Sequence, residues 1–388
     1  MARVVVCGYA IRHPLVGQIF TCLHYVFGLR QLGHDVVYVE ESGWPGSCYD
    51  PVARTYSDDP GAGLDVLRTL LTGIGLDVPV WYVDRSGERT TQGGEEDLRD
   101  VLRSADLLLN LGGVCWLPEF RLCPRRALVD MDPVFTQHGG FGYPILADHD
   151  VLFTYAANIA RRGCSVPTLG LAWWPTLPPV APELWSAACP ESDAAAPFTT
   201  VANWTAYGAM TVDGRTYGQK DQEFLRLGDL PLRAPRRLEL ALSGTDGVAR
   251  EELQCRGWSL RDGHAVSADA EAYRDYLACS RGEFSVAKHA YVTTRSGWFS
   301  DRSVCYLATG RPVVLQDTGF TDWLDAEHGV LAFATPGEAL ARLQEVEECY
   351  ERHRLAARQI AEETFGYRVV LPRLLEVALG RPGARSSA

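Results

Sequence analysis

Basic side chains and a glycine-containing loop occur together in residues 288–300 and in the helix that is predicted to follow. The hydroxyl group of Ser300 can cap the first turn of a helix over residues 301–309. Free amides and the helix dipole at such an end favour an anion. The residues that make up this pattern are Lys288, Arg295, Gly297 and Arg302. The stretch therefore predicts a phosphate site. The alternative is an ordinary strand–helix connection with solvated basic residues.

Two titratable side chains follow another predicted strand, over residues 126–131. Asp132 comes directly after this strand in an Asp-Pro turn, and His138 lies shortly beyond it. In open α/β sheets, polar groups at the carboxyl ends of parallel strands face the ligand crevice. Asp132 and His138 are therefore catalytic candidates. An Asp-Pro turn also occurs for purely structural reasons, and that alternative stays open.

The elements that would position these groups alternate between strand and helix. Residues 4–8 are a β-branched run that ends in glycine, which is typical of a buried parallel strand. A helix over residues 17–32 and a strand over residues 35–40 complete a right-handed βαβ unit. After Gly8 the next glycine is Gly17, so the dinucleotide fingerprint G-x-G-x-x-G is missing. The sequence therefore gives little support to NAD(P) binding.

Composition limits the class of protein. The 388 residues are 46% hydrophobic and 22% charged, enough for two soluble domains with full cores. No apolar run approaches the length of a membrane span, and the first residues do not resemble a signal peptide. The formal charge of −12 argues against a general nucleic-acid surface. The 11 scattered cysteines include no Cys-x-x-Cys, which is typical of a reducing compartment, and no His or Cys pairs have zinc-ligand spacing. We therefore expect a cytoplasmic protein with no metal, no membrane span and no nucleic-acid partner.

The chain divides at a segment rich in proline and alanine. We predict a Rossmann-like first domain over residues 1–172, a linker over residues 173–197 and a Rossmann-like second domain over residues 198–366. A last helix covers residues 367–380, and residues 381–388 are a polar tail that we expect to be disordered. In the first domain a Gly-, Pro- and Asp-rich stretch, residues 41–63, is expected to be a long loop that covers the cleft. The fold class is therefore α/β.

One motif resembles the nucleotide-sugar motif of GT-B glycosyltransferases. It consists of Ser-Gly-Trp-Phe-Ser at 296–300, a helix, and Ala-Thr-Gly-Arg-Pro-Val-Val at 308–314. The resemblance implies two Rossmann-like domains that face a cleft, and a terminal helix that crosses back to the first domain. In that family the loop and the helix start hold the diphosphate. This sequence departs from the pattern, because the two glutamates common in such enzymes fall at Cys305 and Gly297. Asp301 is then the nearest carboxylate for the ribose.

The resemblance also implies which residues bind the donor. Asn203 and Lys220 are assigned from their order along the second domain, and the remaining candidates from the motif and from the loop after the next strand. The complete set of donor-binding candidates is Asn203, Lys220, Lys288, Arg295, Ser296, Gly297, Trp298, Ser300, Asp301, Arg302, Asp317, Thr318, Gly319 and Phe320. No metal or other cofactor is expected, because cations and amides would neutralise the diphosphate.

On the first domain, the loop after the first strand lines the acceptor side of the cleft in such enzymes. His13 would then take a proton from the acceptor hydroxyl, although it is alternatively a loop histidine bonded to the backbone. Together with Asp132 and His138 it completes the catalytic candidates. The predicted function is transfer of a sugar from a nucleoside-diphosphate donor to a hydroxyl or other nucleophile of a small molecule.

The composition suggests a GC-rich bacterial source, and with it natural-product or antibiotic biosynthesis. A glycan or lipid head group is an alternative acceptor. Two alternative functions remain for the whole protein. One is a sugar-nucleotide epimerase of the same shape, and the other is an inactive GT-B protein with a binding or scaffold role. The departure at Cys305 keeps the second one open.

Overall fold

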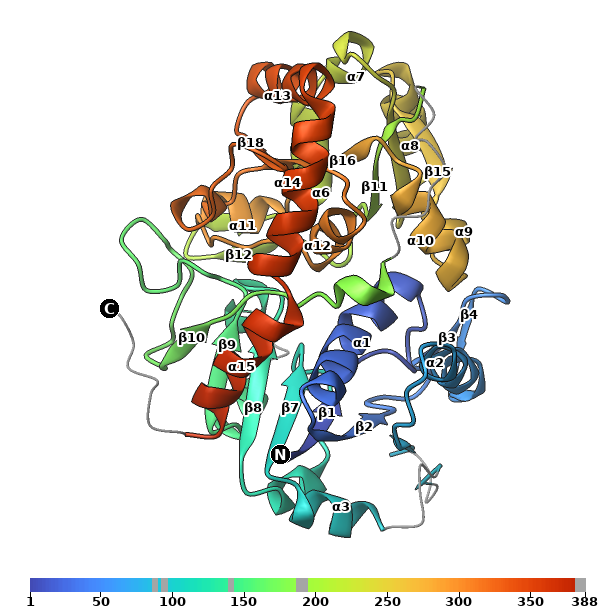
Figure 1. Cartoon of the computed structure of the whole chain (residues 1–388), viewed down its shortest axis with the longest axis vertical. Helices are drawn as coiled ribbons and strands as arrows, with labels where there is room; N and C mark the ends of the chain where they lie inside the picture. Colours follow the sequence, from blue (N-terminus) through green and yellow to red (C-terminus); the bar gives the residue numbers. More distant parts are fainter. Residues whose placement is uncertain (86–89, 92–96, 139–142, 186–194, 381–388) are drawn as a thin grey trace.

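A computed structural model of the chain describes residues 1–85, 90–91, 97–138, 143–185 and 195–380. The chain folds into two α/β domains, one above the other in Figure 1, each built on its own largely parallel sheet. This confirms the predicted fold class. The predicted tail, residues 381–388, lies outside the described residues. No helix in the described part of the chain is long and apolar enough to cross a membrane.

The first sheet has the strand order β10-β9-β8-β7-β1-β2-β5-β6, and all neighbouring pairs are parallel except β5 with β6. The central strands are apolar runs buried on both faces, as parallel sheets require. The strands are β1 (Arg3–Cys7), β2 (Asp35–Glu41), β5 (Val80–Val83), β6 (Thr90–Thr91), β7 (Leu107–Leu111), β8 (Arg126–Asp130), β9 (Val151–Thr154) and β10 (Trp173–Pro175).

The first domain also has a short hairpin and several helices. The stretch predicted as a long loop, residues 41–63, contains the antiparallel pair β3 (Cys48–Asp50) and β4 (Thr55–Ser57). The helices are α1 (Val16–Gln31), α2 (Gly61–Gly73), α3 (Leu98–Ser104), α4 (Phe135–His138) and α5 (Tyr143–Ala147), with 3-10 turns at Pro118–Leu122 and Pro182–Leu184.

The second sheet is parallel throughout, in the order β15-β14-β11-β16-β17-β18. The strands are β11 (Phe198–Asn203), β14 (Leu238–Ser243), β15 (Ser259–Asp262), β16 (Gly282–Ser285), β17 (Val313–Gln316) and β18 (Val330–Phe333). A separate antiparallel hairpin is formed by β12 (Met210–Val212) and β13 (Arg215–Tyr217).

Helices cover the second sheet. They are α6 (Lys220–Arg226), α7 (Leu230–Arg233), α8 (Gly247–Cys255), α9 (Gly263–Val266), α10 (Ala270–Ala278), α11 (His289–Thr293), α12 (Asp301–Ala308), α13 (Pro336–Glu348) and α14 (Tyr350–Glu363), with a 3-10 turn at Phe320–Asp322. Helix α11 lies in the stretch predicted as a loop, residues 288–300. Ser300 caps α12 as predicted, because its hydroxyl oxygen accepts a hydrogen bond from the amide of Arg302 at 3.2 Å.

Two segments connect the domains. The stretch predicted as a linker, residues 173–197, begins instead with β10, which pairs with β9 as the outer strand of the first sheet. Helix α15 (Tyr367–Ala378) leaves the end of α14 and packs on α1 of the first domain (Figure 1). At the crossing point Tyr367 donates its amide to Val180 O, and its ring packs edge-on against Phe27.

Candidate functional site

A cleft of about 460 Å³ lies between the two domains, at the carboxyl ends of the strands of both sheets. The first domain contributes the loop after β1, the start of α1 and the residues after β8, including Tyr9, His13, Gln18, Cys22 and Asp132. The second domain contributes Asn203, Lys220, Ser243, Ser267, Tyr273, Lys288, Tyr291, Trp298, Ser300, Asp301, Arg302 and Cys305. A volume of this size is typical of small-molecule sites.

The two lysines of the sequence, Lys220 and Lys288, both line this cleft. Lys288 precedes α11, and its Nζ atom lies 2.6 Å from Oδ2 of Asp132 in the other domain. The same nitrogen lies 2.7 Å from the hydroxyl oxygen of Tyr207. Tyr207 and Tyr291 also donate their hydroxyl groups to the Asp132 carboxylate. One cation, one carboxylate and two phenols thus form a polar cluster across the cleft.

Lys220 is the first residue of α6 and has a different environment. Its side-chain amine makes no hydrogen bond or ion pair with any residue in the described part of the chain. Burial lowers its pKa well below the usual value, and the positive charges of Arg302 and Lys288 lower it further. The cleft therefore contains an amine that has no hydrogen-bonding or ion-pair partner among the residues the structure describes.

Arg302 lines the cleft, but all three nitrogens of its guanidinium group donate hydrogen bonds within the second domain. Its Nε donates to Oε1 of Glu283 at 2.6 Å, and its other nitrogens donate to Ser285 Oγ and Val201 O, each at 2.8 Å. Glu283 is completely buried, so this ion pair is part of the domain core. Arg302 can add positive potential to the cleft, but it has few donors left for a ligand.

Asp301 and Cys305 lie on the face of α12 that looks toward the first domain. Oδ2 of Asp301 accepts the hydroxyl hydrogen bond of Thr21 from α1 at 2.7 Å. Cys305 Sγ lies 3.7 Å from Nε2 of His24, whose Nδ1 accepts the amide of Ala181. Burial raises the pKa of the Cys305 thiol well above its usual value, so it is a packed thiol rather than a nucleophile.

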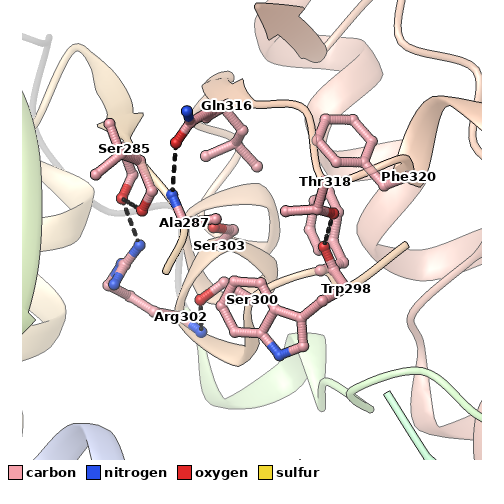
Figure 2. Close-up of a pocket in the computed structure, with 12 residues that line it drawn as sticks. Ser285, Ala287, Trp298, Ser300, Arg302, Ser303, Gln316, Thr318 and Phe320 are labelled. Atoms are coloured by element: carbon pink, nitrogen blue, oxygen red, sulfur yellow. Dashed lines mark hydrogen bonds between the residues drawn. The ribbon is translucent and has the colours of Figure 1, made fainter. Parts of the chain in front are cut away.

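A small cavity lies behind the start of α12, inside the second domain (Figure 2). Its volume of about 20 Å³ is room for a single water molecule. Its walls include the donor-binding candidates Trp298, Ser300, Arg302, Thr318 and Phe320. Thr318 and Phe320 line this inner cavity and not the cleft, and the Thr318 hydroxyl donates to Trp298 O at 2.6 Å. Trp298, Ser300 and Arg302 line both the small cavity and the cleft, so the two spaces adjoin.

The structure does not bring Arg295 to the cleft. Its side chain is about half exposed and pairs with Asp322 at 3.0 Å. Asn158 of the first domain binds the loops on either side, because its Nδ2 donates to Gly319 O at 2.8 Å and to Arg295 O at 3.3 Å. The other candidates in these two loops that do not line the cleft are Ser296, Gly297, Asp317 and Gly319. Their contacts join the domains and fold the loops.

Tight packing explains the two glycines in these loops. Gly297 and Gly319 both have positive φ, and a Cβ atom at either position would lie 2.9 Å or less from atoms of Asn158. Only glycine allows this close approach without a shift of the neighbouring chain.

His13 lies in the cleft among aromatic rings. It stacks on Tyr9 and Tyr49 with centroid distances of 5.7 and 5.1 Å, and its Nε2 is 3.5 Å from the Tyr56 hydroxyl. Burial, and next the charge of His264, lower the pKa of His13 to about 4. The imidazole is therefore neutral at pH 7 and has a nitrogen able to accept a proton.

The third catalytic candidate, His138, is not among the residues that line the cleft. It ends α4 and stacks on Tyr217 of the β12–β13 hairpin at 5.6 Å.

Three tyrosines at the cleft belong to no motif that the sequence reveals. Tyr9 and Tyr291 line the cleft, and Tyr207 lies beside Lys288 at its border. Tyr291 follows Lys288 by one turn of α11, a signal that becomes visible once that stretch is recognised as helical. In the described residues there is no group of three or more His, Cys, Asp or Glu that could hold a metal ion.

Solved structures with this architecture include several sugar transferases. An α-glucosyltransferase in complex with UDP-glucose and DNA matches with a TM-score of 0.60 and 10% identity, over 97% of this chain and 99% of that one. HepE from Anabaena, in complex with UDP and glucose, matches with a TM-score of 0.56 and 11% identity, over 97% and 99%. AviGT4, a glycosyltransferase involved in avilamycin A biosynthesis, matches with a TM-score of 0.54 and 15% identity, over 98% of each chain. No family model and no curated protein sequence matches the chain.

These structures correct one expectation. The negative net charge argues against a nucleic-acid surface and led us to expect no nucleic-acid partner, yet α-glucosyltransferases with this fold are seen in complex with DNA. The inference was wrong because net charge averages over the whole surface, whereas a nucleic acid contacts one face. The matches extend over both domains and nearly the full length, so the chain has the GT-B fold of nucleotide-sugar glycosyltransferases.

Proposed function

We propose that this protein is a glycosyltransferase that uses a nucleoside-diphosphate sugar as donor and binds it in the cleft between the domains. The observation that carries the proposal is the position of Lys220 and Lys288. Among the 37 Lys and Arg side chains only these two are lysines, and both line the same cleft. Titratable, flexible amines at one site fit the phosphates of a leaving group.

In the proposed reaction the bond between the anomeric carbon and the β-phosphate oxygen breaks, and its electron pair leaves with the diphosphate. Lys220 and Lys288 stabilise the charge that develops there. An acceptor oxygen forms the new bond to the anomeric carbon and gives up its proton. His13 is the proposed acceptor of this proton, because it is neutral and lies on the first-domain side of the cleft. Lysines rather than a metal ion neutralise the leaving group in this proposal.

We propose a small-molecule acceptor, as in natural-product glycosylation. The support is that AviGT4, which shares the fold, is involved in avilamycin A biosynthesis. A nucleic-acid acceptor is the second candidate, favoured by the complexes of the α-glucosyltransferases with DNA. The aromatic rings around His13 suit either one, because a planar or pyranose ring can stack on them.

The experiment begins with calorimetric binding of UDP, GDP, TDP and ADP, followed by turnover of the matching sugar nucleotide. Release of the nucleoside diphosphate together with a glycosylated product, from a panel of hydroxylated small molecules or from DNA, would support the transferase. Conversion of the donor sugar without release of nucleotide would favour an epimerase instead. Binding without any turnover would favour a scaffold role, and absence of nucleotide binding would overturn the proposal.

A further inference from the structure

The cations that line the cleft differ in how they are neutralised. The ammonium group of Lys288 is paired with Asp132 at 2.6 Å, and the guanidinium group of Arg302 is paired with Glu283 at 2.6 Å. Lys220 alone of these three has no side-chain hydrogen bond or ion pair to a residue that the structure describes. It is therefore the cation whose charge depends most on what enters the cleft.

The charged groups that act most strongly on Lys220 come from the elements around the cleft. Arg302 of α12 and Lys288 before α11 repel its ammonium form, whereas Glu283 of β16 and Asp301 of α12 attract it. Both carboxylates are already engaged, Glu283 by Arg302 and Asp301 by the Thr21 hydroxyl and the amide of Arg302. Burial and the two cations prevail, so the pKa of Lys220 is lowered.

We propose that Lys220 takes up a proton when the diphosphate of the donor binds, so that donor binding and protonation are coupled at this site. The inference rests on the proposed donor site and adds a mechanism of pH control to it. A bound diphosphate places negative charge beside the amine, which favours the ammonium form.

The choice of lysine supports this role. An arginine keeps its charge at every accessible pH, whereas a buried lysine can lose its proton and regain it. An empty cleft with a neutral Lys220 avoids placing a third positive charge beside Arg302 and Lys288. The full positive charge then appears only when the phosphates are present to balance it.

The first test is isothermal titration calorimetry of UDP at pH 8, in two buffers with different ionisation enthalpies. At that pH the terminal phosphate is ionised, because its second pKa is about 6. We expect a net uptake of up to about one proton per bound UDP, and an affinity that falls by up to about tenfold per pH unit above the pKa of free Lys220. Lys220→Arg should still bind UDP but show no uptake, whereas the matched variant Lys288→Arg should retain it.

The second test observes the amine directly. Reductive methylation with ¹³C-formaldehyde labels only Lys220, Lys288 and the amino terminus, because the chain has no other amines of this kind. The Lys220 resonance, identified by its loss in Lys220→Arg, should titrate below the Lys288 resonance in the free protein. Saturating UDP should move its titration to higher pH.

The outcomes separate this inference from the proposed function. UDP binding without proton uptake, or uptake that survives in Lys220→Arg, would overturn the coupling but leave the donor site intact. A Lys220 resonance that titrates at the ordinary lysine pKa of about 10.4 would also overturn it. Failure of every nucleoside diphosphate to bind would overturn both.

Discussion

The Nζ atom of Lys288 lies 2.6 Å from Oδ2 of Asp132, and this ion pair joins the two domains across the cleft. Because the proposed donor would need the same ammonium group, its diphosphate competes with Asp132. A partly exposed pair of this kind contributes about 1 kcal/mol or less. Asp132→Asn should therefore tighten UDP binding by up to that amount, measured by calorimetry. Weaker binding would mean that Asp132 orients Lys288 for the ligand instead of competing for it.

The sequence assigned both Lys220 and Arg295 to the donor site, but the structure supports only Lys220. The structure places Lys220 in the cleft and Arg295 outside it, paired with Asp322. Lys220→Ala should weaken UDP binding by about 1.5–3 kcal/mol, the scale of a charged hydrogen-bond partner. Arg295→Ala is the matched control and should leave the affinity unchanged. If Arg295→Ala weakens binding instead, the sequence-based assignment of the diphosphate to Arg295 is correct.

His13 should govern turnover but not donor binding. His13→Ala should lower kcat by about 10²–10⁴-fold, the range for loss of a general base, and leave UDP affinity unchanged. Because its pKa is lowered to about 4, kcat/KM for the acceptor, measured at saturating donor so that Lys220 does not contribute, should stay flat between pH 5 and 7. A histidine with the ordinary pKa of about 6.5 would instead lose about tenfold by pH 5.5. Full turnover in His13→Ala would remove it from the mechanism.

His24 should make the protein sensitive to acid. Burial lowers its pKa to about 3, below the value of about 6.5 expected in the unfolded chain. Between these values the unfolded state binds the extra proton. The contribution of neutral His24 is therefore complete above pH 6.5 and is lost as pH falls toward 3.

The loss amounts to up to about 1.4 kcal/mol of unfolding free energy per pH unit in that window. His24→Asn preserves an acceptor for the amide of Ala181 and should reduce the slope, as measured by urea denaturation from pH 7 to 4. An unchanged slope would show that other groups carry the acid sensitivity.

Replacing Gly28 by alanine should destabilise the protein, because α1 and α15 are in contact there. A Cβ atom at this position would lie 2.6 Å from Leu371 Cδ1 and 2.7 Å from Tyr367 Cβ. Helix propensity alone would favour alanine by about 1 kcal/mol, but overpacking costs about 1–3 kcal/mol. Gly28→Ala should therefore lower stability in urea denaturation. The control is Gly73→Ala at the exposed end of α2, where nothing lies within 4 Å and stability should not fall.

Local patterns in the sequence predicted much of the fold. Three patterns were informative because they reflect only neighbouring residues and burial. They are the β-branched run before Gly8, the helix cap at Ser300 and the motif that includes Pro312. They therefore predicted β1, the start of α12 and β17. The resemblance to GT-B glycosyltransferases, and not local pattern, assigned Asn203 and Lys220 to the donor side, and both line the cleft together with Lys288.

Side-chain directions within loops were less predictable. Arg295 has a positive φ, and its backbone is bonded to Asn158, so its side chain turns toward Asp322 and solvent. His138 ends a short helix that packs on the β12–β13 hairpin, which has no periodic signal in the sequence. Both depend on contacts with residues far away along the chain.

The sequence by itself determined that the chain has two parallel α/β units and which residue types could bind a diphosphate. Only the tertiary structure decided that Lys288 forms an ion pair with Asp132 and that Arg302 forms one with Glu283. It also decided that the Lys220 side chain has no partner among the described residues. The physical reason is that the spacing of apolar residues and the capping of helices are determined by residues close together in the sequence. Charge pairing across a cleft depends instead on how two separately folded domains are held together.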